Sequence, residues 1–290
     1  MDYLRYSILG GDNRQKECAK ILADKGDTVF VYGIDSAFND NVTVFNILDG
    51  DFFKCDVLIL PVPYKNSDGY INHITGGKVL ALTELAKLIS PRTLVILGKA
   101  DTEIDEISKV YGFEYFDLLD DEAFAVLNSI PSAEGAIQRA MENTDITIHG
   151  SQSLVLGYGR LGKTLARMLK GIGANVTVAA RKDYDLAWIV ENGYMEIPLK
   201  NLNAIIYKQD IIFNTIPTLI LDADKLAKIK KNALIIDLAS YPGGVDFQTA
   251  KKLGIKATLE LSLPGIVAPK TAANIICMRI HELVKQKFFR

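Results

Sequence analysis

The stretch Leu154-Val155-Leu156-Gly157-Tyr158-Gly159-Arg160-Leu161-Gly162 decides the fold of this chain. A short apolar strand runs into the pattern G-x-G-x-x-G, and the segment that follows, 161–172, has apolar residues at helical spacing. A second β-branched run comes next, at 175–180. A strand, a glycine loop, a helix and a second strand in this order are typical of the phosphate-binding part of a Rossmann domain.

Each glycine of the loop has a different structural role. Gly157 permits the tight turn, Gly159 lets the backbone approach a pyrophosphate, and Gly162 lets the helix pack closely on the strand. The N–H groups of Arg160 and Leu161, at the positive end of the helix, would hold the phosphates. The alternative is a glycine-rich turn in an α/β domain that binds no dinucleotide.

The residues after the second strand bear on which dinucleotide binds. NAD-binding domains usually place Asp or Glu there, to accept hydrogen bonds from the ribose 2′-hydroxyl. Here the strand ends at Ala180 and is followed by Arg181 and Lys182, two cations that would attract a 2′-phosphate. We therefore expect NADP rather than NAD, although Asp183 follows and a solvated surface pair is the alternative.

Three more segments follow strands of this domain, at the edge where such sheets bind ligands. They are 214–217, 237–240 and 263–265. We expect them to be loops around the nicotinamide ribose and carboxamide, and the alternative is that their Pro and Gly residues only make turns. The binding residues expected in them are Thr215, Ile216, Pro217 and Gly265.

The first half of the chain opens in the same way, because Tyr6-Ser7-Ile8-Leu9-Gly10-Gly11 also runs from a strand into glycines. Short apolar runs alternate with helical patterns throughout, which predicts an α/β fold of two Rossmann-like domains with parallel sheets. Asp12, however, would cap the next helix where a phosphate would bind, and would repel it. We expect a degenerate first domain whose glycine turn faces substrate in a cleft between the domains. The strands expected are 6–9, 28–32, 57–60, 93–97, 113–116, 153–156, 175–180, 211–214, 233–237 and 256–259.

Two helices bear on the domain organisation. One is expected at 133–143, with Ser132 as its N-cap, in the connection between the domains. The last helix has an apolar stripe, and we expect it to pack back on the first domain. The boundaries expected are 1–130 for the substrate-side domain, 131–150 for the connection, 151–268 for the NADP-binding domain and 269–290 for the returning helix.

The composition excludes several classes of protein. The chain has 290 residues, with 33 Lys and Arg against 35 Asp and Glu, so we expect neither nucleic acid nor an anionic membrane as a partner. Its three cysteines and three histidines form no metal-ligand pattern, and we expect neither a metal site nor a disulfide framework. The sequence shows no signal peptide and no apolar run of about 18 residues, which predicts a cytoplasmic protein.

Longer motifs lie in both domains and in the connection. They are Gly10-Gly11-Asp12-Asn13-Arg14-Gln15, then Asn128-Ser129-Ile130-Pro131 with Glu134-Gly135, then 144–152, then Asp237-Leu238-Ala239-Ser240 with Pro242-Gly243-Gly244, and then 263–272. In this order they closely resemble the dipicolinate synthase A subunit family. The layout is also similar to that of hydroxyacid dehydrogenases and adenosylhomocysteinase.

The resemblance implies a sporulation enzyme of endospore-forming bacteria. The family oxidises dihydrodipicolinate to dipicolinate with NADP in the mother-cell cytoplasm, beside a flavoprotein-like B subunit. The implied substrate is thus a small dicarboxylate, and dihydrodipicolinate and its hydrated precursor both remain open. A homo-oligomer also remains open.

The implied reaction needs cations for the two substrate carboxylates. Arg14 is the first choice, because a guanidinium binds a carboxylate in bidentate fashion. Lys270, at the start of the last helix, is the second. The alternative for each is a surface or interdomain ion pair.

The implied reaction also releases a proton. Asp12, Glu134 and His149 are candidates to accept it, although His149 is more typical of a structural hydrogen-bonding residue and Asp12 of a helix cap. Ser240 could hydrogen-bond substrate or cofactor. Because aromatisation makes the step strongly downhill, a powerful base is not required.

Two other functions remain open. One is a different NAD(P)-dependent dehydrogenase, acting on a hydroxyacid or an amino acid, although no Arg–Glu–His relay is evident in the second half. The other is a non-catalytic protein that binds NADP and docks on a flavoprotein-like chain. An intact glycine loop suits an enzyme and a sensor equally, so the motif does not separate them.

Overall fold

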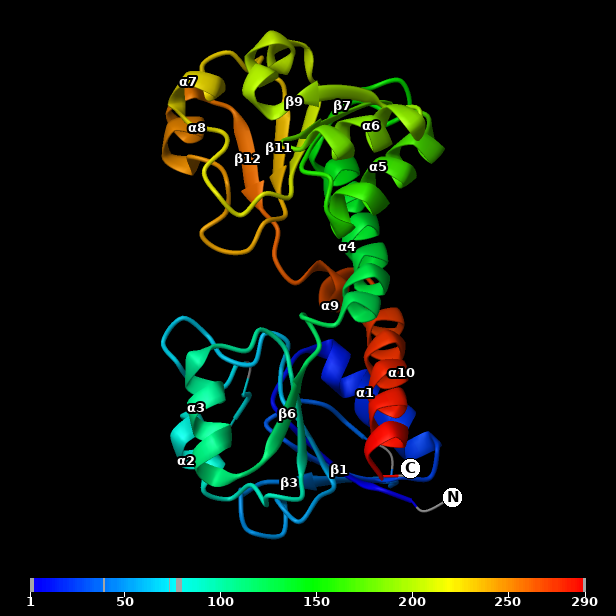
Figure 1. Cartoon of the computed structure of the whole chain (residues 1–290), viewed down its shortest axis with the longest axis vertical. Coiled ribbons are helices and arrows are strands. Elements are labelled where there is room, and N and C mark those ends of the chain that lie inside the picture. Colours follow the sequence, from blue (N-terminus) through cyan, green and yellow to red (C-terminus); the bar gives the residue numbers. More distant parts are fainter. Residues whose placement is uncertain (1–2, 39, 73, 77–79, 289–290) are drawn as a thin grey trace. The chain divides into compact units, whose positions relative to one another are not determined.

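The structure is a computed structural model that describes residues 3–38, 40–72, 74–76 and 80–288. It divides into two compact units: unit 1 comprises 1–128 and 268–290, and unit 2 comprises 129–267. Each unit contains a six-stranded sheet in which all the described strand pairs are parallel (Figure 1). The prediction of two Rossmann-like α/β domains is confirmed.

Unit 1 has the strand order β3-β2-β1-β4-β5-β6. Its central strands are buried on both faces: Ile8 of β1 faces the core formed with α1 and α10, while its neighbour Leu9 faces the opposite core, near α2 and α3. Residues alternate in this way because successive side chains of a strand point to opposite sides. The elements are β1 (Arg5–Leu9), α1 (Asn13–Asp24), β2 (Thr28–Tyr32), β3 (Val42–Phe45), β4 (Val57–Ile59), α2 (Leu82–Ala86), β5 (Leu94–Leu97), α3 (Thr102–Tyr111), β6 (Glu114–Asp117) and α10 (Pro269–Phe288).

The last helix, α10, lies along α1 in unit 1 (Figure 1), which confirms that it packs back on the first domain. The Cys18 thiol of α1 donates to the carbonyl of Ala273 at 3.6 Å. Arg279 Nη2 donates to Asp121 Oδ2 at 2.6 Å. The buried face of α10 consists of Ala272, Ala273, Ile276, Cys277, Ile280 and Val284.

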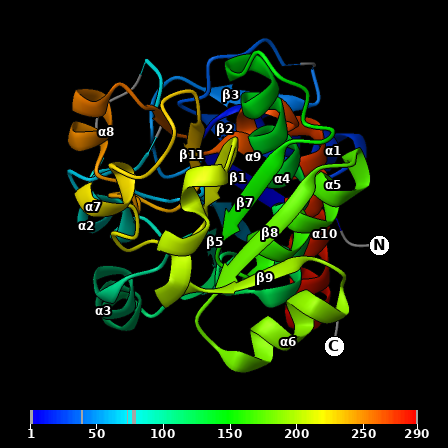
Figure 2. The same cartoon turned by 90° about the horizontal axis from the view of Figure 1, so that it is seen from above.

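Unit 2 repeats the topology, with the order β12-β11-β10-β7-β8-β9. Figure 2 shows β7, β8 and β9 side by side. One face of the sheet packs with α4 and α5 and the other with α7 and α8. The elements are α4 (Glu122–Asn143), β7 (Gln152–Leu156), α5 (Arg160–Ile172), β8 (Asn175–Ala180), α6 (Asp183–Glu191), β9 (Met195–Pro198), the 3₁₀ turns Leu199–Ala204 and Ile206–Lys208, β10 (Ile211–Asn214), α7 (Ala223–Leu226), β11 (Leu234–Asp237), α8 (Phe247–Leu253), β12 (Lys256–Leu259) and α9 (Leu263–Val267).

Each sheet contains one strand that the sequence did not predict. These strands, β3 and β9, pair with β2 and β8 at an edge of their sheets. Residues of both are mostly exposed or half-buried, so neither segment has the continuous apolar run that marks a central strand. Edge strands of this kind form because they pair with a neighbouring strand, and their own residues carry little sign of it.

The helix predicted at 133–143 begins earlier, at Glu122, and Pro131 lies inside it, so the prediction that Ser132 is its N-cap is wrong. A proline inside a helix removes one hydrogen bond and usually marks a helix start or a kink. Here tertiary packing outweighs that cost: Phe124 is buried in the core of unit 1, and Ala133 and Ile137 are buried in the core of unit 2.

Candidate functional site

Two glycines of the loop between β7 and α5 are required by the fold itself. Gly157 has a φ of +100°, and a Cβ there would stand 2.4 Å from Thr215 Oγ1. A Cβ on Gly162 would stand 2.2 Å from the carbonyl oxygen of Gly157. A side chain at Gly157 would be strained by the positive φ and would displace Thr215, and one at Gly162 would require movement of the backbone, as expected for a tight turn and for close helix packing.

The third glycine, Gly159, has no such reason within the protein. Its φ of −80° suits any residue, and a Cβ there would meet no atom within 4 Å. It is the N-cap of α5, it has no side chain with which to cap the helix, and the first turn of α5 carries no acidic residue. The N-terminus of α5 therefore presents backbone N–H groups and a positive dipole beside open space, an arrangement that suits a dinucleotide pyrophosphate.

A buried polar pair fixes the neighbouring loops. Asn214 and Asp237, the last residues of β10 and β11, are fully buried, and Asn214 Nδ2 donates to Asp237 Oδ1 at 2.8 Å. The Asp237 carboxylate also accepts from Ala239 N at 3.1 Å and Gly244 N at 2.7 Å, and Asn214 Oδ1 accepts from Ile216 N at 3.1 Å. The sequence pattern indicated the segments 214–217 and 237–240 but not this hydrogen-bonded pair, which holds the loops by accepting from their backbone N–H groups.

Three of the predicted cofactor residues lie on the loop after β10. Thr215 bonds to the carbonyl of Leu156 through both N and Oγ1, at 2.9 and 2.8 Å, which holds it against the glycine loop. Ile216 is half-buried and Pro217 is exposed. The structure thus brings this loop to the start of the glycine loop.

Gly265, the fourth, lies in the short helix α9, so the loop predicted at 263–265 is wrong. Leu263 and Val267 of α9 pack against α4 at Gly135, where a Cβ would approach Leu263 Cβ to 2.9 Å. Burial of Leu263 explains why this proline- and glycine-containing segment is helical rather than extended.

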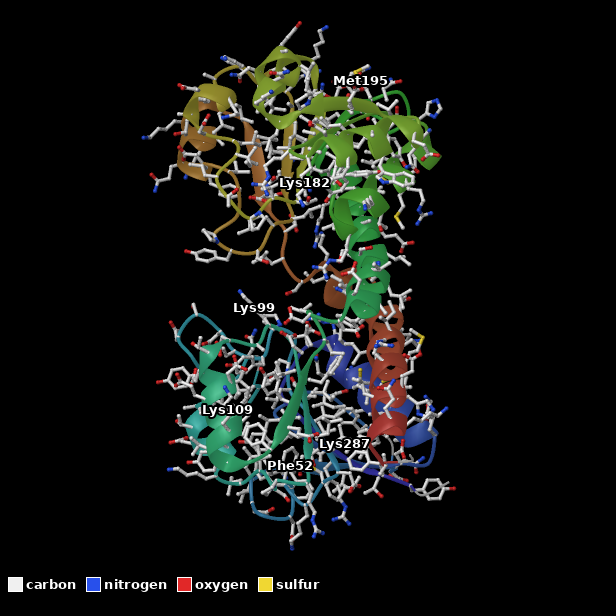
Figure 3. The ribbon with its side chains drawn as sticks, viewed as in Figure 1. Phe52, Lys99, Lys109, Lys182, Met195 and Lys287 are labelled. Atoms are coloured by element: carbon white, nitrogen blue, oxygen red, sulfur yellow. The ribbon has the colours of Figure 1, made fainter. Side chains whose placement is uncertain are left out.

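At the end of β8, the first exposed residues are cationic. Ala180 is buried, and Arg181 and Lys182 are exposed (Lys182 is labelled in Figure 3). Lys182 Nζ donates to Tyr184 Oη at 3.0 Å, which raises the pKa of Lys182. Asp183 is in the first turn of α6, where a carboxylate stabilises the helix dipole, so a structural reason exists for this acidic residue.

In unit 1, the corresponding helix start is filled by side chains. Asp12 Oδ1 accepts from Arg14 N at 2.9 Å. The Asp12 side chain also accepts from the backbone N–H of Gln15, and Gln15 Oε1 accepts from Asp12 N at 3.1 Å, which together form a capping box. The Arg14 guanidinium is buried, donates to both oxygens of Asp12, and donates from Nη2 to the carbonyl of Val62 at 2.7 Å. A bidentate grip on a substrate carboxylate would require Arg14 to release Asp12.

The other predicted catalytic residues are divided between the units. Lys270 is exposed in the first turn of α10, in unit 1. Glu134 on α4 and Ser240 after β11 are exposed, in unit 2. His149 precedes β7, at the amino edge of the sheet, and its Nδ1 lies 3.0 Å from the carbonyl of Ile172. Its place at the edge opposite the glycine loop, with this contact, suits the structural alternative rather than the catalytic one.

A charged cluster at the carboxyl edge of the sheet of unit 1 was not found from the sequence. Lys65 Nζ donates to Asp101 Oδ2 and Glu103 Oε2, both at 2.5 Å, and Tyr64 Oη donates to Asp101 Oδ1 at 2.8 Å. Burial would raise the pKa of Asp101, but these donors outweigh it and lower the pKa. The signal was weak because these residues come from segments almost 40 positions apart.

Lys99 follows β5 at the same edge (Figure 3) and has a φ of 66°, in the left-handed region that favours glycine. Asp117 holds this conformation by accepting from the N–H groups of Lys99 and Ala100, at 2.9 and 2.6 Å. Strained residues of this kind are concentrated at functional sites. Lys99 is thus a candidate cation that the sequence pattern did not reveal.

Comparisons with known proteins agree with this arrangement. The family model for the N-terminal domain of the dipicolinate synthase A subunit matches residues 5–119, and that for the S-adenosyl-L-homocysteine hydrolase NAD binding domain matches residues 125–264. The dipicolinate synthase A subunit of Bacillus subtilis (strain 168) is 37% identical over 287 residues, covering 98% of this chain and 96% of that protein. The chain belongs to the dipicolinate synthase A subunit family.

Solved structures of the same family have the same fold. The dipicolinate synthase A subunit of Bacillus halodurans has a TM-score of 0.87 at 36% identity, with 97% of each chain covered. The dipicolinate synthase A chain of Bacillus subtilis also has a TM-score of 0.87, at 35% identity, and the match covers 99% of this chain and 97% of that one. Unit 2 is accordingly a Rossmann domain of the nicotinamide-dinucleotide-binding type.

Within the described residues, no group of three or more His, Cys, Asp or Glu side chains is arranged to hold a metal ion. Over the same residues, none of the helices combines the length and the apolar character needed to cross a bilayer.

Proposed function

We propose that this protein is the A subunit of a dipicolinate synthase and oxidises dihydrodipicolinate to dipicolinate with NADP. Similarity over 98% of the chain to a protein named as the A subunit of that enzyme is the observation that carries the proposal. The open N-terminus of α5 supports the cofactor half of it, because a helix terminus without a side-chain cap is the phosphate-binding feature of such domains.

The cofactor is held by the residues around the glycine loop. Backbone N–H groups of Arg160 and Leu161 bind the pyrophosphate, which approaches over Gly159. Arg181 and Lys182 bind the 2′-phosphate, and no carboxylate stands at the end of β8 to favour NAD. When bound, NADP supplies an acceptor for hydride. Contacts to the nicotinamide ribose and carboxamide come from Thr215, Ile216 and Pro217.

The substrate loses one hydride and one proton. One ring C–H bond breaks as the hydride leaves. A second bond to hydrogen breaks on the adjacent ring atom, its electron pair forms the double bond that makes the ring aromatic, and the proton passes to a carboxylate or to water. Arg14 and Lys270 neutralise the substrate carboxylates, and Asp12 and Glu134 are the proposed proton acceptors. Ser240 orients the substrate or cofactor by hydrogen bonding. Because aromatisation drives the step, positioning contributes more than base strength.

The setting of the reaction is part of the same proposal. The relative is named as one subunit of its enzyme, and the partner that we propose is a flavoprotein-like B subunit, with the reaction in the cytoplasm of the mother cell during sporulation. Dihydrodipicolinate and its hydrated precursor differ by one water molecule, so the hydrated precursor would have to lose that water as well as the hydride and the proton to become dipicolinate.

The test uses the purified full chain, with and without the B subunit. NADP and NAD are titrated by fluorescence, and freshly generated dihydrodipicolinate is then added while NADPH and dipicolinate are followed by absorbance. We expect NADP to bind well ahead of NAD, and both products to appear together. Tight NADP binding with no NADPH when both chains are present would exclude hydride transfer and favour a non-catalytic role. Turnover of hydroxyacids or amino acids instead would identify a different dehydrogenase.

A further inference from the structure

Unit 2 has a hollow of about 430 Å³ between α5 and α6, here called the α5–α6 groove. Its volume is within the range of about 300–1,000 Å³ that small-molecule sites occupy. The lining combines cationic, amide and aromatic groups from Tyr158, Lys163, Arg167, Trp188, Asn192 and Tyr194. Apart from Tyr158, none of these residues belongs to the glycine loop.

Two cations stand on the α5 side of the groove. Lys163 and Arg167 are four residues apart and therefore share one face of the helix. Within the part of the chain that the structure describes, neither forms an ion pair with a carboxylate. Like charges at this spacing repel one another, so the pair slightly destabilises α5 unless an anion binds.

Aromatic rings supply the other walls. Trp188, on α6, is 56% exposed, which is high for the largest apolar side chain. Lys163 Nζ lies 5.3 Å from the centre of the Tyr158 ring. Burial raises the pKa of Tyr194, and the positive charge of Arg167 opposes that shift, so the guanidinium and the phenol lie near one another. Rings and cations thus face the same space.

Negative charge lies on α6, which carries Asp185 and Glu191, whereas the two cations lie on α5. Burial is the main cause that raises the pKa of Tyr158, and the charges of Asp185 and Glu191 add to it. An anionic ligand would avoid these two carboxylates. Its negative groups would therefore be bound by Arg167 and by Lys163, with its ring toward Trp188.

We propose that the α5–α6 groove binds a planar aromatic dicarboxylate, with its carboxylates on Lys163 and Arg167 and its ring stacked on Trp188 and Tyr194. A guanidinium matches a carboxylate in bidentate fashion, and aromatic rings stack on one another in offset arrangements. The specific ligand is pyridine-2,6-dicarboxylate, the product of the reaction proposed above. This choice of compound rests on the proposed function, whereas the class of ligand rests on the groove. The groove is then a product-binding site beside the cofactor loop.

The chain contains one tryptophan, Trp188, so its fluorescence reports on this groove alone. Metal-free sodium pyridine-2,6-dicarboxylate is titrated into the full chain, with excitation at the red edge of tryptophan absorption, where the ligand does not absorb. We expect saturable quenching that persists when NADP is saturating. Adenosine monophosphate, a planar aromatic anion of another class, is titrated in parallel and should bind more weakly.

Variants assign the signal. Arg167→Ala should raise the Kd for the dicarboxylate about 2- to 5-fold, and adding Lys163→Ala should raise it further, as expected for loss of exposed ion pairs. Lys251→Ala, which removes an exposed cation of α8, should leave the Kd unchanged. All variants should keep the NADP affinity and thermal midpoint of the parent protein, which excludes misfolding.

The outcomes separate this inference from the proposed function. Absence of saturable quenching, an unchanged Kd in Arg167→Ala, or tighter binding of adenosine monophosphate would overturn the inference, even if dipicolinate is made. Quenching that Lys270→Ala abolishes would also overturn it, because the ligand would then be in the proposed substrate site. Quenching that meets every expectation supports the groove even in a protein that shows no turnover.

Discussion

Gly159→Ser separates the cofactor role of the glycine loop from its role in the fold. The Cβ of the introduced serine would enter open space at a φ of −80°, and serine is a better helix N-cap than glycine. Its hydroxyl would accept from the N–H groups at the start of α5, which are the groups that a pyrophosphate needs. We therefore expect the free energy of unfolding to change by less than about 1 kcal/mol, while cofactor binding weakens.

The magnitude follows from the bonds that are lost. A hydrogen bond to a charged group contributes about 1.5–3 kcal/mol, so losing one phosphate contact raises the Kd for NADP about 10- to 150-fold. Gly162→Ala should instead lower the free energy of unfolding. Its Cβ would stand 2.2 Å from a backbone oxygen, and overpacking costs about 1–3 kcal/mol of stability. Gly171→Ala, on the same helix with no atom within 4 Å, is the matched control and should change neither NADP affinity nor, by more than about 1 kcal/mol, stability.

Isothermal titration with NADP and urea unfolding measure the two effects on the same preparations. If Gly159→Ser binds NADP as tightly as the parent, the dinucleotide does not approach over this residue. If Gly162→Ala is as stable as the parent, the close contact at Gly157 does not constrain the helix, and the distinction between the two glycines fails.

Three further changes have defined expectations. Replacing both Arg181 and Lys182 by Ala should raise the Kd for NADP about 10-fold or more and leave that for NAD unchanged, which calorimetry with both nucleotides would measure; equal losses would contradict the 2′-phosphate assignment. Asn214→Ala leaves a buried carboxylate without its amide donor and should lower the urea-unfolding free energy by about 1–3 kcal/mol, whereas an unchanged midpoint would contradict the role of the pair. Burial would raise the pKa of Asp121, but hydrogen bonds, chiefly from Arg279, lower it overall, so this contact stabilises the fold above the unfolded pKa of about 3.9 and is lost as the pH falls through the folded value. Asp121→Asn should therefore destabilise the protein by about 1 kcal/mol at neutral pH and progressively less in acid, and a difference from the parent that does not shrink would refute this.

Sequence patterns predicted the parts of the fold that depend on local chemistry. The central strands are apolar on both faces, and the strand and glycine-loop motif is complete within nine consecutive residues. Both could therefore be recognised without knowing which residues lie beside them in the fold. The α4 helix could not, because the pattern around Pro131 favours a helix start and only burial of residues on both sides of it keeps the helix continuous.

The candidate site was less predictable for the same reason. The bond between Asn214 and Asp237 exists because β10 and β11 pair in a register that sets these residues opposite one another. The Arg14 guanidinium donates to the carbonyl of Val62, which is 48 positions away in the sequence. The type of a residue and its position after a strand can suggest that it binds a ligand. Only the folded structure shows that its side chain is already bonded to another part of the protein.

The two units share a sheet topology but differ at the start of the helix that follows the first strand. Their sheets have the same strand order, and each first strand is followed by a glycine of positive φ, Gly10 at 65° and Gly157 at 100°. The difference lies at the next helix, where Asp12 caps α1 with a negative charge while Gly159 leaves the terminus of α5 without a side chain. A carboxylate satisfies the same N–H groups that a phosphate would, and its charge repels a second anion. The cap therefore stabilises α1 by the interaction that the N-terminus of α5 leaves available to a ligand.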